Sequence, residues 1–185
     1  MTRPTDAAPA MRPDPSRALE SGYRAAAERM RGLPIFNEAL QVEAVGFHQW
    51  EGQWLGVVIT PWFMNLTLAP ADPSAWSPLP VRGKRKLRLP AGDFEFIGAE
   101  DAQLGEFQTC SLFSPMTEFA DQEGARLVAQ LSLQALFDPA NAEVPPAPPS
   151  VAADAPAAAA KAPVAVSKRD FLRGRLGGPR ADGQG

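Results

Sequence analysis

The stretch L-G-V-V-I-T-P-W-F-M-N-L-T-L, residues 55–68, contains the most apolar run of the chain and decides its fold. Apolar side chains stand at both odd and even positions from 55 to 59, so both faces of an extended strand would be apolar, which favours a strand inside a sheet. Pro61 cannot donate a hydrogen bond to a neighbouring strand and therefore ends or bends this one. Residues 62–68 alternate again and predict a further strand.

Outward from this stretch, alternation and turn residues predict four more strands and two helices. Glu51-Gly52 predicts a tight hairpin turn, and Pro90-Ala91-Gly92 predicts a second turn. The predicted strands are residues 42–49, 53–60, 62–68, 84–89, a strand from 93 onward, and 104–113. The expected fold class is α+β: a single antiparallel β-sheet of about five to six strands, flanked by an N-terminal and a C-terminal helix, with disordered tails.

The N-terminal helix is predicted from Ser16, as its cap, to about Arg31. Its expected buried stripe is Leu19, Tyr23, Ala26, Ala27 and Met30. The C-terminal helix is expected to end near Phe137, and either Ser114-Pro115 or Asp121 suits its start. Its apolar stripe is expected to be Ala120, Gly124, Leu127, Val128, Leu131 and Ala135.

Composition divides the chain into four parts. Residues 1–15 are rich in Pro and Ala and are expected to be disordered, and residues 16–138 form the predicted domain. Residues 139–166 are a Pro/Ala-rich linker expected to act as a tether, and residues 167–185 are a basic C-terminal segment.

The charge distribution argues against nucleic acid as a partner. The chain has a formal net charge of −3, and five basic residues fall between Arg82 and Arg88. Pairing strands 84–89 and 93 onward would bury Leu87, Leu89, Phe94 and Phe96 and set Lys86 and Arg88 beside Asp93 and Glu95 on the wet face. A solvated sheet face is therefore the preferred interpretation of this cluster.

No signature of a membrane span, secretory signal, cofactor or metal site is found in the sequence. No apolar run approaches the 18 residues of a membrane helix, and the N-terminus lacks an apolar signal core. One cysteine excludes an internal disulfide and fits a reducing compartment. Cys110 and His48 are too few ligands for structural zinc, and the chain has no phosphate-binding glycine motif. A catalytic Cys110–His48 pair stays open as an alternative to an ordinary buried cysteine.

Four motifs carry a resemblance to a known family. They are L-P-I-F-N-E-A-L (33–40), V-G-F-H-Q-W-E-G-Q-W-L-G (45–56), T-P-W-F-M-N-L (60–66) and C-S-L-F-S-P-M-T-E-F-A-D (110–121). In this order, from about Leu33 to Phe137, the chain resembles the assembly chaperones of nickel–iron hydrogenases, HybE/HupJ type.

The resemblance implies a cytoplasmic, non-enzymatic maturation factor without a cofactor. Its expected partner is the signal-bearing precursor of the hydrogenase small (iron–sulfur) subunit, before assembly and twin-arginine export, with the large subunit or other assembly factors as further partners. A small enzyme using Cys110 and His48, or a structural subunit of the mature complex, are the alternatives. The expected contact residues combine aromatic, Met and polar side chains: Trp62, Phe63, Met64, Asn65, Phe113, Pro115, Met116, Glu118 and Phe119.

The segment S-K-R-D-F-L-R, residues 167–173, is similar to the twin-arginine export motif, although a real signal stands near the N-terminus. Two interpretations remain open: a basic tail that matches by chance, or a pseudo-signal that competes with the client's own signal. In the second, Lys168, Arg169 and Arg173 supply charge, and Phe171 with Leu172 the apolar anchor.

Overall fold

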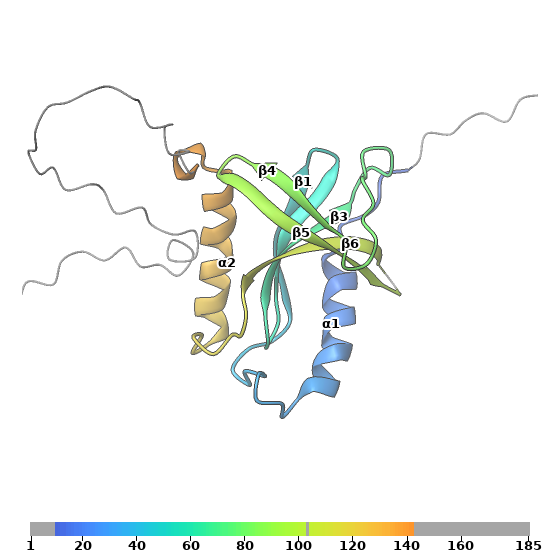
Figure 1. Cartoon of the computed structure of the whole chain (residues 1–185). Coiled ribbons are helices and arrows are strands. Elements are labelled where there is room, and N and C mark those ends of the chain that lie inside the picture. Colours follow the sequence, from blue (N-terminus) through green and yellow to red (C-terminus); the bar gives the residue numbers. More distant parts are fainter. Residues whose placement is uncertain (1–9, 103, 143–185) are drawn as a thin grey trace, which may run out of the picture. The chain divides into compact units, whose positions relative to one another are not determined.

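The computed structural model describes residues 10–102 and 104–142, which form one six-stranded antiparallel sheet with a helix on each face (Figure 1). The elements are α1 (Ser16–Met30), β1 (Glu43–Trp50), β2 (Gln53–Ile59), β3 (Met64–Pro70), β4 (Lys84–Leu89), β5 (Gly92–Asp101), β6 (Gly105–Phe113), α2 (Gln122–Phe137) and the 3-10 turn η1 (Pro139–Asn141). The predicted fold class is confirmed.

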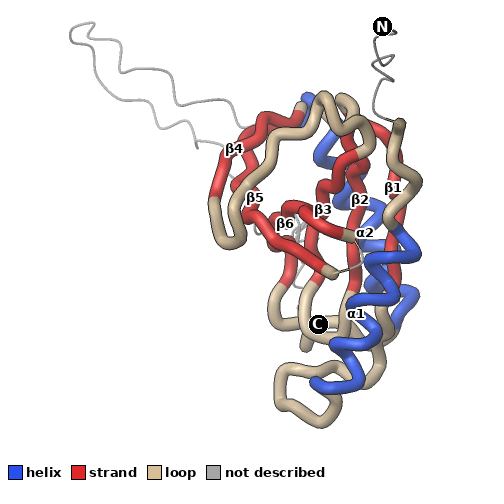
Figure 2. The backbone as a smooth tube through the Cα atoms, turned by 90° about the vertical axis from the view of Figure 1, so that its right-hand side faces the viewer, coloured by secondary structure: helices blue, strands red, loops and turns tan. Residues whose placement is uncertain are grey.

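The sheet consists of two three-stranded meanders. Its strand order is β1-β2-β3-β6-β5-β4, so each meander is built from strands consecutive in sequence, and the β3–β6 ladder joins them. The sheet is strongly curved, and β4 and β5 run across the direction of the first meander (Figure 2).

The hairpin turn lies where the sequence predicts it, but the third strand begins later than predicted. Glu51 and Gly52 both have positive φ, as the predicted tight hairpin requires. β3 begins at Met64 and not at Trp62, because residues 60–63 close into a turn: Thr60 N donates to Phe63 O at 2.8 Å. Trp62 and Phe63 therefore lie outside the hydrogen-bonded ladder.

α1 covers one face of the sheet. Leu19 packs with Val58, Ala69 and Phe107, and Tyr23 packs against this cluster. The prediction that Ser16 caps the helix is wrong, because Pro15 occupies the cap position and Asp14 Oδ1 accepts the hydrogen bond from Ser16 N at 2.8 Å. The carboxylate of Asp14 thus satisfies a free amide of the first turn.

α2 covers the opposite face and begins at Asp121, whose Oδ1 accepts a hydrogen bond from Gly124 N at 2.7 Å. The alternative start at Ser114-Pro115 is wrong, since this cis peptide belongs to the connection from β6. The predicted stripe is also wrong. The residues that face the sheet are Ala125, Ala129, Ser132, Leu133 and Leu136. Leu127 and Leu131 lie on the outer side, because the small alanines let the helix backbone approach the sheet.

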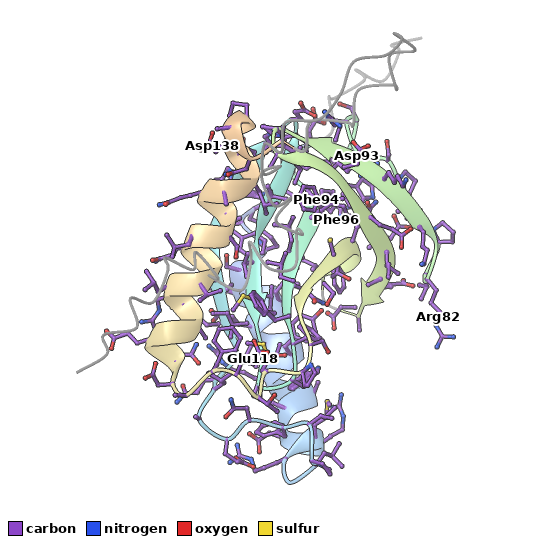
Figure 3. All side chains as sticks on the ribbon, turned by 60° about the vertical axis from the view of Figure 1, so that its left-hand side comes forward. Arg82, Asp93, Phe94, Phe96, Glu118 and Asp138 are labelled. Carbon is purple, nitrogen blue, oxygen red and sulfur yellow. The ribbon has the colours of Figure 1, made fainter. Side chains whose placement is uncertain are left out.

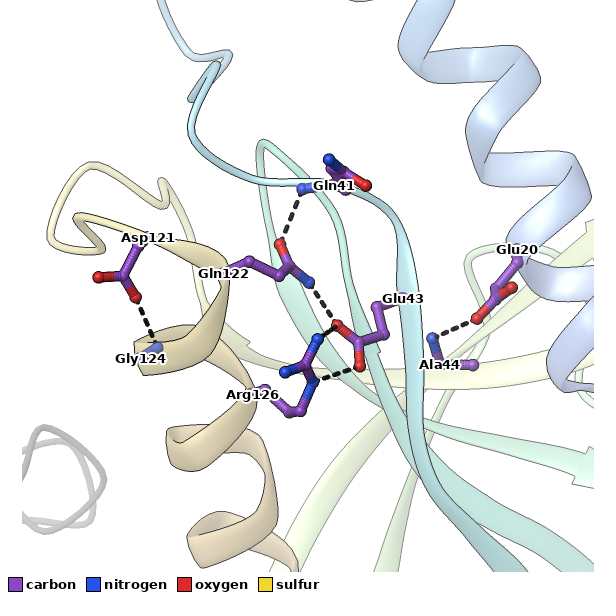
Figure 4. A network of polar contacts seen from close by, with 8 residues as sticks. All are labelled: Glu20, Gln41, Glu43, Ala44, Asp121, Gln122, Gly124 and Arg126. Carbon is purple, nitrogen blue, oxygen red and sulfur yellow. Dashed lines mark hydrogen bonds and ion pairs between the residues drawn. The ribbon is translucent and has the colours of Figure 1, made fainter.

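A polar network ties the edge strand β1 to both helices (Figure 4). Glu43 receives hydrogen bonds from Arg126 Nε at 2.6 Å and from Gln122 Nε2 at 2.6 Å, and Gln122 Oε1 accepts from Gln41 N at 2.8 Å. On the other side, Glu20 Oε1 accepts from Ala44 N at 3.0 Å. These contacts fix the position of α1 and α2 relative to β1.

Replacing Glu43 by glutamine should lower stability only above the pKa of Glu43. Burial raises the pKa of this carboxyl, but the hydrogen bonds from Arg126 and Gln122 outweigh burial and lower the pKa below its ordinary value of 4.5. A lowered pKa in the folded state contributes stability above pH 4.5 that is lost as the pH falls through the lowered pKa. Thermal unfolding of the parent and of Glu43→Gln, measured between pH 7 and pH 3, should show the two midpoints converging as the pH falls.

Glu28→Gln is the matched control, because the Glu28–Arg31 pair is fully on the surface and should leave the pH profile unchanged. If the difference in thermal midpoint between Glu43→Gln and the parent stays constant down to pH 3, the ionised carboxylate does not stabilise the fold.

The β4–β5 hairpin curves toward the end of α2. Leu89 and Phe96 are buried as predicted, while Leu87 and Phe94 are half-buried, and Figure 3 shows Phe94 and Phe96 on the inner side of the hairpin. Ala91 N, in the hairpin turn, donates to Leu136 O at 3.0 Å. The hairpin is therefore attached to the helix on which the sheet packs.

Several predictions lie outside the described residues: most of the N-terminal segment 1–15, the linker 139–166 from residue 143 onward, and the basic segment 167–185. Among the residues that are described, neither helix is long and apolar enough to cross a membrane.

Candidate partner-binding surface

Asn37 joins three of the sequence motifs at one end of the molecule. Its Nδ2 donates to Met116 O at 2.9 Å and to Phe119 O at 2.8 Å, in the connection between β6 and α2. Its backbone N donates to Pro61 O at 2.9 Å, in the turn between β2 and β3. We call this meeting of residues 33–40, 60–65 and 113–119 the Asn37 junction.

A turn stabilised by Thr60 presents the two aromatic residues of the middle motif. The Thr60 hydroxyl accepts hydrogen bonds from Trp62 N at 3.3 Å and Phe63 N at 3.0 Å, and it donates to Phe63 O at 3.0 Å. Thr60 and Pro61 are buried. Because the backbone bonds to its own threonine, Trp62 and Phe63 are held in place without a strand partner.

The aromatic rings of this end form a continuous row. Phe36 stacks on Trp62 at 6.1 Å between centroids, Trp62 meets Phe63 edge-on at 5.6 Å, and Phe63 meets Tyr23 of α1 at 5.4 Å. Burial, followed by the charge of Asp101, raises the pKa of Tyr23 to about 12, so its hydroxyl stays protonated at neutral pH. The row is thus anchored in the α1 side of the core and ends at Phe36.

Two exposed apolar side chains extend this row to the surface. Leu33 and Ile35 precede Phe36 in the same loop and are 46% and 47% exposed. Phe36, Trp62 and Phe63 are half-buried. We call Leu33, Ile35, Phe36, Trp62 and Phe63 the Trp62 surface. Contiguous apolar and aromatic groups of this kind are typical of protein–protein contact sites.

The predicted contact residues fall into two groups. Met64, Phe113 and Met116 are buried and support the junction from beneath. Asn65 and Phe119 are half-buried, and Phe119 packs edge-on against Phe113 at 5.3 Å. Pro115 and Glu118 are exposed, and Figure 3 shows Glu118 in the segment that leads to α2. The buried Oδ1 of Asn65 has no hydrogen-bond partner among the described residues.

Comparison with known proteins places these motifs in a family. A family model described as "[NiFe]-hydrogenase assembly, chaperone, HybE" matches residues 14–174. The chain belongs to this family. The match includes the whole Asn37 junction, and it also extends over residues 167–173. The HybE family therefore makes this chain a hydrogenase maturation protein with hydrogenase subunits as its partners, which agrees with a role in protein binding.

Named relatives support this assignment. The hydrogenase expression/formation protein HupJ of Bradyrhizobium diazoefficiens is 48% identical over 126 residues, 68% of this chain and 73% of that protein. The hydrogenase-2 operon protein HybE of Escherichia coli K12 is 31% identical over 136 residues, 72% of this chain and 84% of that protein. The solution structure of HybE from Escherichia coli matches with a TM-score of 0.59 at 23% identity, covers 86% of this chain and 98% of that one, and so shows the shared fold.

The structure does not bring together the alternative pair of catalytic residues. His48 lies on β1 and Cys110 on β6, and β2 and β3 run between them. The Nδ1 of His48 is 2.9 Å from Gly46 O, and its ring packs against Phe137 of α2. Within the described ranges, no group of three or more His, Cys, Asp or Glu side chains could hold a metal ion. The family model that matches the chain is described as that of an assembly chaperone.

The basic residues of β4 occupy both faces of the strand. Lys84 pairs with Glu95 at 2.8 Å and Arg88 with Asp93 at 3.1 Å on the solvated face. Arg85 is the exception: it lies on the inner face, its NH2 group donates to Gln53 Oε1 at 3.4 Å, and burial lowers its pKa. The ion-paired outer face supports the interpretation of this cluster as a solvated sheet face.

Sequence reasoning missed Asn37 as a central residue of the site. Asn37 stands among apolar residues in L-P-I-F-N-E-A-L, as Asn65 does in its own motif. A buried amide in such a setting needs partners. The sequence contains this signal, an asparagine among apolar residues. Only the folded chain shows that the hydrogen-bond acceptors of its side chain are backbone carbonyls about eighty residues further on.

Proposed function

We propose that this chain is a non-enzymatic chaperone that binds the immature small (iron–sulfur) subunit of a nickel–iron hydrogenase in the cytoplasm, before assembly and twin-arginine export. The observation that carries the proposal is the Asn37 junction. It gathers three family motifs at one end of the molecule and holds Trp62 at the surface between Phe36 and Phe63. A site built for chemistry would instead gather acid, base or nucleophile side chains.

The Trp62 surface suits an unfinished client. Exposed Leu33 and Ile35 offer apolar area, while Trp62 offers a large, stiff side chain whose truncation typically weakens a contact strongly. Exposed Glu118 and half-buried Asn65 add polar groups near this area that give the contact specificity. Binding of this kind is reversible, and it ends when the client buries its own apolar surface against the large subunit.

Affinity purification of the tagged chain from hydrogenase-producing cells tests the proposal. The small-subunit precursor, with its signal still attached, should co-purify, and the mature processed enzyme should not. Recovery of the large subunit alone would overturn the assignment of the client. Stoichiometric presence of this chain in purified mature hydrogenase would instead favour a structural subunit.

Replacing Cys110 by serine should leave client binding and hydrogenase maturation unchanged. The side chain of Cys110 is half-buried in β6, and its separation from His48 removes the base that thiol chemistry would need. Hydrogenase activity in cells that carry Cys110→Ser, relative to the parent, measures the effect, with thermal unfolding as the check on folding. Loss of maturation by a folded variant would revive the thiol-dependent alternative.

A further inference from the structure

The sheet has two edges, and side chains close the edge formed by β1. Ala44 N donates to Glu20 Oε1 of α1 at 3.0 Å, and Gly46 O lies 2.9 Å from Nδ1 of His48. A bulge between Val45 and His48 also interrupts the strand. Bulges and side chains that occupy backbone groups keep other strands from pairing with a sheet edge.

The opposite edge, formed by β4, leaves backbone groups unpaired. β4 ends the strand order and lies on the outside of the curved sheet (Figure 2). Gly98 N donates to Gly83 O at 2.8 Å, one position before the first β4–β5 pair. Because bonded and unbonded pairs alternate along an antiparallel ladder, Lys84, Lys86 and Arg88 point their backbone N–H and C=O groups away from β5. No described residue bonds to these outward groups.

The side chains of this edge leave one positive charge unpaired. Lys84 and Arg88 form ion pairs with acidic residues of β5. Lys86 stands between them and is exposed, and within the described part of the chain it has no ion-pair partner. Its cross-strand neighbour, Glu95, is bound to Lys84. An acidic side chain on the open side of Lys86 would form the cross-strand pair that β5 does not supply.

This charge pattern opposes pairing between two copies of the chain. If two β4 edges paired antiparallel, the basic side chains on the outer face of one copy would stand opposite those of the other. Like charges directly opposite each other destabilise a strand pair, whereas opposite charges stabilise it. The backbone of the edge is therefore open, while its side chains discriminate between partners by charge.

We propose that the β4 edge binds an extended, acidic segment of a partner protein as an additional antiparallel strand. The outward backbone groups of Lys84, Lys86 and Arg88 bond to the backbone of the segment, and acidic side chains at every second position lie beside the three basic ones. Apolar side chains between the acidic ones contact half-buried Leu87 on the inner face. Strand addition takes its affinity from the backbone and its specificity from alternate side chains. The edge is separate from the Trp62 surface, so a negative result leaves the function proposed above as it stands.

Amide hydrogen exchange of the full chain, followed by NMR, tests the proposal with a capped peptide of about seven residues that alternates glutamate and valine. In the dilute free protein, the amides of Lys84, Lys86 and Arg88 should exchange fast, and those of Arg85 and Leu87 slowly. At about ten times its dissociation constant, the peptide should slow exchange in the first group about tenfold.

Two N-methylated forms of the peptide show whether its backbone pairs with β4. In the proposed antiparallel register, the glutamate amides face Lys86 and the valine amides point away from it. Methylation of the glutamate nitrogens should therefore abolish binding, and methylation of the valine nitrogens should preserve it. Both peptides are measured on the parent chain, so this comparison does not depend on the folding of a variant.

Replacing Lys86 by glutamate should weaken peptide binding about tenfold, because like charges then stand opposite each other. Arg17→Glu, the same change of charge at an exposed position of α1, is the matched control and should bind as the parent does. Equal binding of the two methylated peptides, or an affinity that Lys86→Glu leaves unchanged, overturns the proposal. Protection of the Lys86 amide in the free chain also overturns it. Such protection would reveal a second copy as the occupant if it disappears on dilution, and a segment of the same chain if it persists.

Discussion

Replacing Asn37 by alanine is expected to lower the free energy of unfolding by about 2–4 kcal/mol, because two carbonyls of the β6–α2 connection lose their donor. Met116 O and Phe119 O both accept from Asn37 Nδ2 in a part-buried setting. Urea denaturation followed by circular dichroism measures the change. The variant should also lose affinity for the client, because the β6–α2 connection beside the Trp62 turn is released, although the backbone bond from residue 37 N to Pro61 O is kept.

Asn141→Ala is the matched control for this change. The amide of Asn141 makes one hydrogen bond, to Ala135 O at 3.1 Å, at the far end of α2. Its loss should lower the free energy of unfolding by about 1 kcal/mol and leave client binding unchanged. An Asn37→Ala variant as stable as Asn141→Ala would show that the junction is held by packing alone.

Replacing Trp62 by alanine should weaken client binding about thirtyfold or more, the typical effect of about 2 kcal/mol for an interfacial aromatic. Trp62 is half-buried, packs on Phe36 and Phe63, and lies outside the strand ladder, so the fold should tolerate the truncation. Isothermal titration against the small-subunit precursor gives the affinity, and the thermal midpoint of the free protein gives the stability.

Two further variants separate binding from folding. Trp76→Ala removes another half-buried tryptophan, which lies in the loop before β4 and donates from Nε1 to Glu106 Oε2 of β6 at 3.2 Å, and it should bind the client normally. Phe63→Ala should lower stability as well as binding, since the Phe63 ring packs on Tyr23 of α1. A Trp62→Ala variant that is unfolded, or that binds as tightly as Trp76→Ala, would remove the functional role of the Trp62 surface.

The sheet could be predicted because its signals are local. The short apolar run from residue 55 to 59 and the Glu51-Gly52 turn before it indicate a hairpin directly, and the observed pairing of Trp50 with Gln53 agrees with it. The alternation of 84–89 likewise predicts β4 within its observed bounds. In each case the residues that specify the structure lie within a few positions of one another in the sequence.

The orientation of α2 could not be predicted in this way. A prediction from periodicity gives weight to large apolar residues, so it placed Leu127 and Leu131 on the face of the helix that is buried against the sheet. The sheet instead receives Ala125 and Ala129, and Gly46 of β1 lies so close to Leu133 that an added Cβ would stand 2.6 Å from its Cδ1. The choice between the two faces depends on the shape of the sheet opposite, which no local pattern contains.

The arrangement around the candidate site could be predicted only in part, for a related reason. Trp62 and Phe63 follow the proline break and lie outside the strand ladder, whereas their role in binding a client stays a prediction. Burial of Met64 and Met116 depends on β3 and on the β6–α2 connection closing over them. Asn37 acquires its role through hydrogen bonds to residues about eighty positions away.

The division of the sheet into two meanders has a consequence during synthesis of the chain. The first meander is complete at Pro70, whereas its neighbour β6 ends at Phe113, so the ribosome must add roughly forty residues before the β3 edge is paired. At about 5–20 residues per second, this edge stays open for about 2–9 seconds. Leu66 and Leu68, fully buried in the finished protein, lie on that open strand. The chain is thus itself exposed to aggregation for a few seconds, until the two halves of its sheet meet.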